Sequence, residues 1–348
     1  MTRRLSALWW SCAFLAPTLL HDFPGTATAE TPSVENFYKG KTITIVEFSV
    51  AGGPYDIYAR LLAPFLSKHL PGHPAVVVEL MPGAGGLKAA RYLYEAAPKD
   101  GTTIGELSQT LIFEPLLGDA TGNVAYRKFG WLGSMSQATA LFVAWKTSPV
   151  KKAQDLFDHD LMIAGTGAGS ETTVIVSALD GILGTRMKLI QGYAGSPAAM
   201  LAMEQGEVDG AFPTSDTLTL HPDWQSEHKI NILMQTRQIP DPAFAEVPTA
   251  ISLAKTERQR QDLQFLFPRD TIGRPFMAPP GLPPDRLKAL QDAFAAAVQD
   301  PELIALAKQG HNRIELTRGE DLAKVIDDEY ATPADIVTDV RAVIPKSD

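Results

Sequence analysis

The sequence predicts an α/β fold whose strands and helices come in two successive series. Strand-like and helix-like stretches alternate along the chain, first from residue 42 to about 117 and again from residue 141 onward. The strand-like runs are almost entirely apolar, which is typical of strands buried on both faces of a sheet. Alternating units of this length indicate sheets joined by right-handed crossovers, so each half should form a mostly parallel sheet flanked by helices.

In the first series, TITIVEF (42–48) predicts a strand and SVAGGP predicts a turn. The helix expected at 55–70 places its apolar residues on one face, and Pro54 suits its first turn, where no N–H is needed. The pattern then repeats twice, with strands at 75–80 and 102–107 followed by helices at 87–97 and 109–117.

The second series begins with LFVAW (141–145), which predicts a strand. A helix at 196–206 is marked at both ends, because Ser196 can cap it, Pro197 fits its first turn and Gly206 ends it. The other expected elements are strands at 161–165, 187–193, 208–212 and 230–236, a helix at 172–184, and, from residue 274, a strand, a proline-rich turn and helices.

The first 29 residues are expected to be a cleaved secretory signal. Arg3 and Arg4 precede an apolar run too short for a comfortable membrane span, and Ala27-Thr28-Ala29 supplies small residues for cleavage. The single cysteine of the chain lies inside this segment, so the mature protein would have none. An exported protein without disulfides suits a bacterial periplasm.

Length and charge narrow the class of protein. The chain has 348 residues, enough for two domains of ordinary size, and 45% of them are hydrophobic. A net charge of −9 argues against a nucleic-acid-binding surface, so no nucleic-acid partner is expected.

Four glycine-containing loops stand between a strand and a helix start. None has the lysine of a phosphate-binding loop or the glycine spacing of a dinucleotide fingerprint. Helix starts offer free N–H groups and a partial positive charge, so two such loops from each half indicate a shared cleft for an anion. The loops are AGGPYD (51–56), PGAGG (82–86), GTGAGSET (165–172) and YAGSPAA (193–199).

Several longer motifs resemble one protein family. In order along the chain they are ITIVEFSVAGGPYDIYARLLAPFL, VVVELMPGAGG, AAPKDGTTIG, GYAGSPAAMLAMEQGEVDGAF and APPGLPPDRLKALQDAF. They resemble the receptor proteins of tripartite tricarboxylate transporters. The resemblance implies a two-lobed type II periplasmic binding protein fold, a small organic carboxylate ligand and membrane transporter subunits as partners. It implies no catalysis, no cofactor and no metal.

The family usually shows a small hydroxylic pair between its first double glycine and the aspartate that follows. This chain has Pro54-Tyr55 there, which favours an acid that differs from citrate or is larger.

The two lobes are assigned from the order of the expected strands. Residues 30–143 together with 238–348 should form lobe one, and residues 144–237 lobe two. The chain would then cross between the lobes near LFVAW and again near ILMQT, which makes two hinge segments.

The candidate site follows from the loops at the strand ends. Backbone N–H groups and the hydroxyls of Thr166, Ser170 and Ser196 would hold the carboxylate, and Tyr55 would shape one wall. Glu171 would repel such a ligand, as would Asp56, unless turned outward or bridged by water. The full set is Gly53, Pro54, Tyr55, Asp56, Ala84, Gly85, Gly86, Ser108, Gln109, Thr110, Thr166, Gly169, Ser170, Glu171, Tyr193, Gly195, Ser196, Thr214 and Asp216.

The sequence also bears on other classes of function. A serine hydrolase needs the nucleophile elbow Gly-x-Ser-x-Gly, which is absent from the sequence. His69 and His73 have the spacing of a zinc pair, but Pro71-Gly72 between them prevents a shared helical face. A periplasmic sensor that presents its carboxylate to a signalling receptor stays open as an alternative to a transport receptor.

Overall fold

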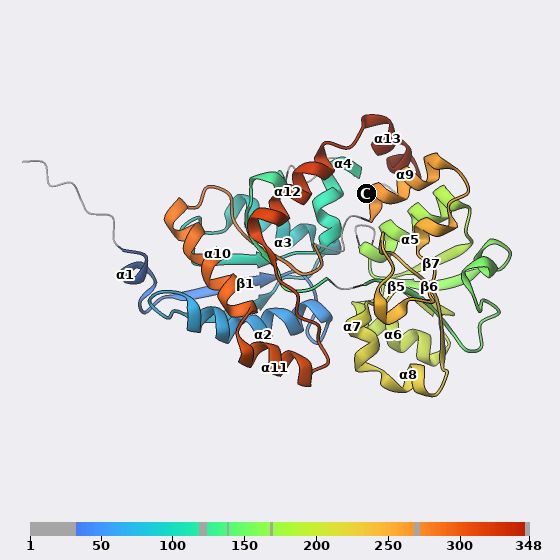
Figure 1. Ribbon diagram of the computed structural model, residues 1–348, viewed down its shortest axis with the longest axis horizontal. Helices are drawn as coiled ribbons and strands as arrows, with labels where there is room; N and C mark the ends of the chain where they lie inside the picture. The colour runs from blue at the N-terminus through green and yellow to red at the C-terminus, as the bar shows by residue number, and fades with distance from the viewer. Residues whose placement is uncertain (1–32, 118–123, 138, 168–169, 268–271, 345–348) are drawn as a thin grey trace, which may run out of the picture. The chain divides into compact units, whose positions relative to one another are not determined.

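The computed structural model describes residues 33–117, 124–137, 139–167, 170–267 and 272–344. The expected signal segment, 1–29, lies outside these residues. The described chain forms two β-sheets, each covered by helices (Figure 1).

The first sheet has six strands in the order β11-β4-β10-β3-β1-β2. Strand β1 pairs in parallel with β2 and β3, whereas β10 runs antiparallel to β3 and β4, and β11 runs antiparallel to β4. The strands are β1 (Thr42–Glu47), β2 (Ala75–Leu80), β3 (Thr103–Glu106), β4 (Gly130–Ser134), β10 (Pro275–Ala278) and β11 (Thr317–Arg318).

Alternation along β1 explains how helices cover both faces of this sheet. Ile43 and Ile45 belong to a buried cluster with residues of α2 and α10, whereas Val46 belongs to the cluster that contains residues of α3 and α12. The helices of this half are α1 (Val34–Tyr38), α2 (Pro54–His69), α3 (Leu87–Arg91), α4 (Glu114–Leu117), α10 (Pro284–Val298), α11 (Pro301–Gln309) and α12 (Gly319–Tyr330).

The second sheet has five strands in the order β7-β6-β8-β5-β9. Leu141 and Val143 of β5 pack with α6, and the intervening Phe142 and Ala144 pack in the cluster that holds residues of α5. The strands are β5 (Leu141–Trp145), β6 (Leu161–Gly165), β7 (Met187–Gln191), β8 (Gly210–Ala211) and β9 (Ile230–Gln235). The helices are α5 (Glu171–Leu183), α6 (Ser196–Gln205), α7 (Ser215–Leu220) and α8 (Pro222–Ser226).

Both sheets are mixed, which corrects the expectation of mostly parallel sheets. Helical crossovers do produce parallel pairs, between β1 and its neighbours and between β6 and its neighbours. However, β10 returns from far along the chain into the middle of the first sheet, and β9 pairs antiparallel with β5 in the second.

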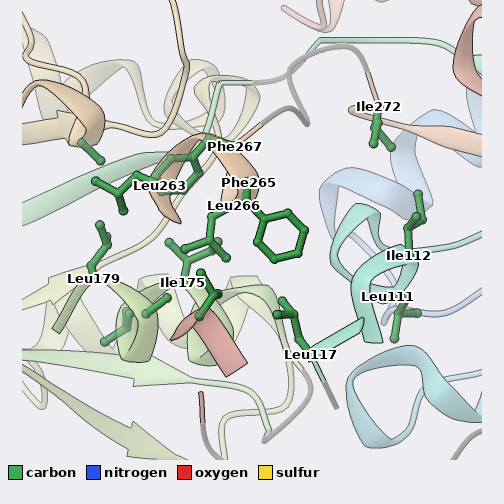
Figure 2. Packing of buried hydrophobic residues seen from close by; sticks show 14 of the residues in the cluster. Leu111, Ile112, Leu117, Ile175, Leu179, Leu263, Phe265, Leu266, Phe267 and Ile272 are labelled. Carbon is green, nitrogen blue, oxygen red and sulfur yellow. The ribbon is translucent and has the colours of Figure 1, made fainter. Parts of the chain in front are cut away.

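Two passages join the sheets, one between β4 and β5 and one between β9 and β10. A third passage follows α12. This helix packs on β4 of the first sheet, whereas the next helix, α13 (Ala334–Val343), packs against α5 and α9 (Glu257–Leu266). Figure 2 shows Ile175 and Leu179 of α5 facing Leu263 and Leu266 of α9. The C-terminal segment therefore contacts helices beside both sheets.

Candidate functional site

A cavity lies where the ends of strands from both sheets meet. Its volume is about 190 Å³, and a water molecule needs only roughly 10–15 Å³ on this scale, so the cavity can hold an organic molecule. Its lining comprises Phe48, Ser49, Val50, Gly53, Pro54, Tyr55, Pro82, Gly83, Ala84, Gly85, Gly86, Ser108, Ala164, Thr166, Ser170, Glu171, Thr172, Ala194, Gly195, Ser196, Ala199, Met200, Phe212, Pro213, Thr214, Thr217 and Arg274.

The PGAGG loop forms one wall of this cavity with a left-handed backbone. Ala84 has a φ of 48°, and Gly85 and Gly86 have φ values of 64° and 102°. A Cβ at Gly86 would lie 2.7 Å from a methyl carbon of Leu111 and 2.9 Å from the ring of Phe48. Glycine is required here because other residues disfavour these φ values and because the backbone packs closely against the sheet.

Three helices begin at the cavity. The cap residues of α2 and α6 are Gly53 and Gly195, which provide no side-chain cap, and the side chain of Ser170 caps α5 by accepting from the Thr173 N–H. The first N–H groups of a helix lack partners within it and carry a partial positive charge. These three helix ends therefore favour an anion in the cavity.

Arg274 lines the cavity and is 1% exposed. It stands directly before β10, and its backbone N–H donates to Oγ of Ser134 at 3.0 Å. Among the described residues its guanidinium makes long polar contacts, 3.5 Å to the Thr214 hydroxyl and 3.4 Å to Asp216. Its Nε is buried without a hydrogen-bond partner among the described residues.

Aromatic rings hold this guanidinium in place. Its carbon lies 4.2 Å from the ring centre of Tyr55 and 5.4 Å from that of Tyr58, within cation–π range. Phe48 meets the Tyr55 ring edge-on, with ring centres 4.6 Å apart. Burial raises the pKa of Tyr55 to about 12, although Arg274 opposes the shift, so its hydroxyl stays neutral.

Two buried glutamates stand at the strand ends near Arg274. Glu47 of β1 is paired in register with Glu106 of β3, and both are fully buried. Burial raises the pKa of Glu47 to about 7, although the Ser49 N–H that donates to it opposes the shift. Burial also raises the pKa of Glu106 well above its ordinary value, and Glu47 adds to this effect. Raised pKa values favour the protonated, neutral form of a carboxyl group. The two glutamates therefore place less than two full negative charges near Arg274.

Glu171 is the acidic side chain of the described cavity lining. It is the first residue of α5, and its Oε1 accepts a 2.6 Å hydrogen bond from Nε2 of Gln109. Gln109 follows β3 of the first sheet and Glu171 follows β6 of the second, so this bond crosses the cleft.

Most of the candidate residues from the sequence lie in the cavity wall. These are Gly53, Pro54, Tyr55, Ala84, Gly85, Gly86, Ser108, Thr166, Ser170, Glu171, Gly195, Ser196 and Thr214. Gln109 is outside the lining but bonds to Glu171. Gly169 and the side chain of Thr110 lie outside what the structure describes.

Three candidates lie elsewhere. Asp56 accepts from the Gly52 N–H and pairs with Arg60, so it caps the start of α2. Asp216 lies behind the wall, against Arg274. The hydroxyl of Tyr193 donates to Glu207 at 3.3 Å, and its ring packs against the cluster beneath α6.

Sequence reasoning missed Arg274, Glu47 and Glu106. The glutamates carry a weak signal, because both end an apolar strand of the same series (TITIVE and TTIGE). The sequence signal at Arg274 is its place directly before the apolar run PFMA, and this does not indicate a residue of the cleft. The cleft therefore holds a cationic side chain beyond the backbone N–H groups and hydroxyls that the sequence predicts.

Two further features are absent from the described residues. They hold no group of three or more His, Cys, Asp or Glu side chains placed to bind a metal ion. No helix among them is both long enough and apolar enough to cross a membrane.

Comparisons with known proteins agree with this architecture. The family described as tripartite tricarboxylate transporter family receptor matches residues 58–341. A relative from Agrobacterium vitis, a UPF0065 protein in the TAR-I ttuE-ttuC' intergenic region, is 27% identical over 286 residues, 78% of this chain and 75% of its own.

Solved structures show the same fold. The periplasmic binding protein BugD has a TM-score of 0.70 and 22% identity, covering 88% of this chain and 99% of its own. MatC from Rhodopseudomonas palustris, solved with bound malate, has a TM-score of 0.67 and 22% identity, covering 85% and 99%.

These similarities confirm the two-lobed periplasmic binding protein fold. The matching family is one of receptors, which confirms the expectation of a binding protein rather than an enzyme. Because the family match spans most of the sequence, this chain belongs to the receptor family of tripartite tricarboxylate transporters.

Proposed function

We propose that this protein is a periplasmic receptor that captures a small organic carboxylate in the cleft and delivers it to the membrane subunits of a tripartite tricarboxylate transporter. The observation that carries the proposal is Arg274, a buried guanidinium that lines the cavity. The malate bound to MatC, a protein of the same fold, supports the class of ligand.

The charge around Arg274 explains why a carboxylate suits this site. A buried charge needs a close partner, and the contacts of this guanidinium to Thr214 and Asp216 are longer than a normal hydrogen bond. Burial lowers the pKa of Arg274, but its neighbours, Asp216 among them, together outweigh burial and raise it, so the group stays charged. A ligand carboxylate would complete its coordination.

The rest of the lining adds neutral donors. The helix starts at Gly53, Ser170 and Gly195 lie in the cavity wall, where first-turn N–H groups lack partners within the helix, and the hydroxyl residues Ser196 and Thr166 line it too. Each hydrogen bond to a charged ligand group contributes about 1.5–3 kcal/mol.

Replacing Arg274 by glutamine tests the proposal. Arg274→Gln keeps a hydrogen-bonding side chain but removes the charge, so affinity for carboxylates such as malate should fall roughly 10- to 100-fold. Isothermal titration calorimetry on the purified protein measures this. Lys88→Gln is the matched control, because Lys88 follows the same cleft loop yet is exposed and absent from the described lining.

Two outcomes would contradict separate parts of the proposal, the binding site and the delivery role. If folded wild-type protein binds none of a panel of C3–C6 carboxylates, or if Arg274→Gln binds as tightly as Lys88→Gln, the carboxylate site is wrong. If deleting the gene leaves cellular uptake of a confirmed ligand unchanged, the delivery role is wrong while binding stands.

A further inference from the structure

The cavity carries one charge of each sign on its described wall. Arg274 comes from the first sheet, at the start of β10, and Glu171 comes from the second half, at the start of α5. Burial raises the pKa of Tyr55, and both charges act on it as well, Arg274 by lowering the pKa and Glu171 by raising it. A site for a ligand that is anionic throughout would not need an acidic side chain in its wall.

The orientation of Glu171 is not explained by its place at the start of α5 alone. An acidic residue in the first turn of α5 interacts well with the helix dipole, and it could do so from a solvent-facing rotamer. Here the carboxylate turns toward the first sheet, where Gln109 donates to Oε1, and the residue lines the cavity. Gln109 is itself buried, with 6% exposed, so the pair is held in place.

The other acids near the cavity are outside its described lining. Glu106 is fully buried, and burial raises its pKa well above its ordinary value, which favours its neutral form. Asp56 is engaged by the Gly52 N–H and by Arg60, and Asp216 faces Arg274. Glu47 accepts from the Ser49 N–H behind the wall. Glu171 is thus the carboxylate placed to meet a ligand among the described residues.

We propose that the ligand carries a cationic donor, such as an ammonium group, that pairs with Glu171 while its carboxylate pairs with Arg274. The ligand class is then an amino carboxylic acid rather than a di- or tricarboxylate. This inference rests on the proposed function, because it needs Arg274 to hold the carboxylate. Tyr55 lines the cavity beside the carboxylate end of such a ligand, with its ring 4.2 Å from the guanidinium carbon of Arg274.

Matched ligand series test the inference. For each chain length from three to six carbons, calorimetry compares the alkanoate, the terminal amino acid and the dicarboxylate. We expect the amino acid to bind at least tenfold more tightly than the dicarboxylate of equal length. Glu171→Gln can still accept from Gln109 but has no charge, so it should weaken the amino acid and strengthen the dicarboxylate, each roughly tenfold.

A control separates the charge of Glu171 from a general loss of negative charge. Glu79→Gln removes an exposed carboxylate on β2 and should leave the affinity ratio unchanged.

The outcomes separate this inference from the proposed function. If dicarboxylates bind as tightly as the amino acids, or if Glu171→Gln leaves the ratio as it was, the inference is overturned and the carboxylate receptor stands. If no carboxylate binds the folded protein, both are overturned.

Discussion

Glu47 shows how a single buried residue can set the pH response of this fold. It ends β1, is fully buried, and has Glu106 as its neighbour in register on β3. Asp56 adds negative charge nearby, while Arg274 and the Ser49 N–H oppose it. Because water solvates a carboxylate better than this site does, the folded protein holds the Glu47 proton more tightly than the unfolded chain does.

The sign of the effect on stability follows. The pKa of Glu47 is raised from 4.5 to about 7, so its stabilising contribution is complete below about pH 4.5 and is lost as the pH rises through 7. The full span corresponds to about 3 kcal/mol. Glu47→Gln cannot ionise, so its free energy of unfolding should be higher than wild type at pH 8 and should fall less between pH 5 and pH 8.

Urea denaturation followed by tryptophan fluorescence at pH 5, 6.5 and 8 checks this prediction. Glu79→Gln, on the exposed edge strand β2, serves as the control and should follow the wild-type slope. Equal slopes for Glu47→Gln and wild type would contradict the raised pKa.

The residues of the site were predictable to the extent that local sequence determines them. PGAGG and the helix starts at Gly53, Ser170 and Gly195 were found because turn and cap chemistry is local. Arg274 was not, since its role depends on β10 returning into the first sheet from more than 160 residues beyond β3. Tyr193 was misplaced because sequence does not fix which way a loop side chain turns, and its hydroxyl pairs with Glu207.

At the scale of elements, the contact between α5 and α13 shows what the sequence could not reveal. The strand–helix alternation predicted most elements, but it gave no pairing for β4, β10 or β11, and long-range pairing makes the first sheet mixed. It also placed residues 238–348 in lobe one, an assignment that stays a prediction. In the structure β10 and β11 join the first sheet, while α9 and α13 pack on α5.

Gly181 makes this helix contact possible. A Cβ added there would lie 2.3 Å from Cβ of Val343, too close for any native packing. Gly181→Ala would normally favour a helix by roughly 1 kcal/mol. Here overpacking should reverse the sign, and we expect a loss of about 1–3 kcal/mol in the free energy of unfolding.

A double substitution checks the cause. Val343→Ala in the Gly181→Ala background removes the two methyl groups beyond Cβ and should recover part of the loss, which chemical denaturation of the three variants would measure. If Gly181→Ala stabilises the protein, the close packing of α5 on α13 is wrong.

At the scale of the whole molecule, the two sheets are joined by chain passages and by side-chain bonds across the cleft. Gln109 donates to Glu171, and Arg274 reaches Asp216, so each bond links an element of the first sheet to one of the second half. Periplasmic binding folds respond to ligand by favouring a closed arrangement of their lobes. We expect these bonds to favour closure even before a ligand adds its own contacts.

Gln109→Ala tests this coupling between closure and binding. Losing one charged hydrogen bond should shift the ligand-free protein toward an open state. Part of the free energy of binding would then be used to close the lobes, so the apparent affinity would fall. Affinity for an alkanoate, which has no ammonium group to pair with Glu171, should fall roughly tenfold, because for such a ligand the bond joins the lobes rather than contacting the ligand. Small-angle scattering should give the ligand-free variant a larger radius of gyration than wild type, and saturating ligand should bring both to the same value. A variant that binds as tightly as wild type and scatters identically without ligand would show that closure does not depend on this bond.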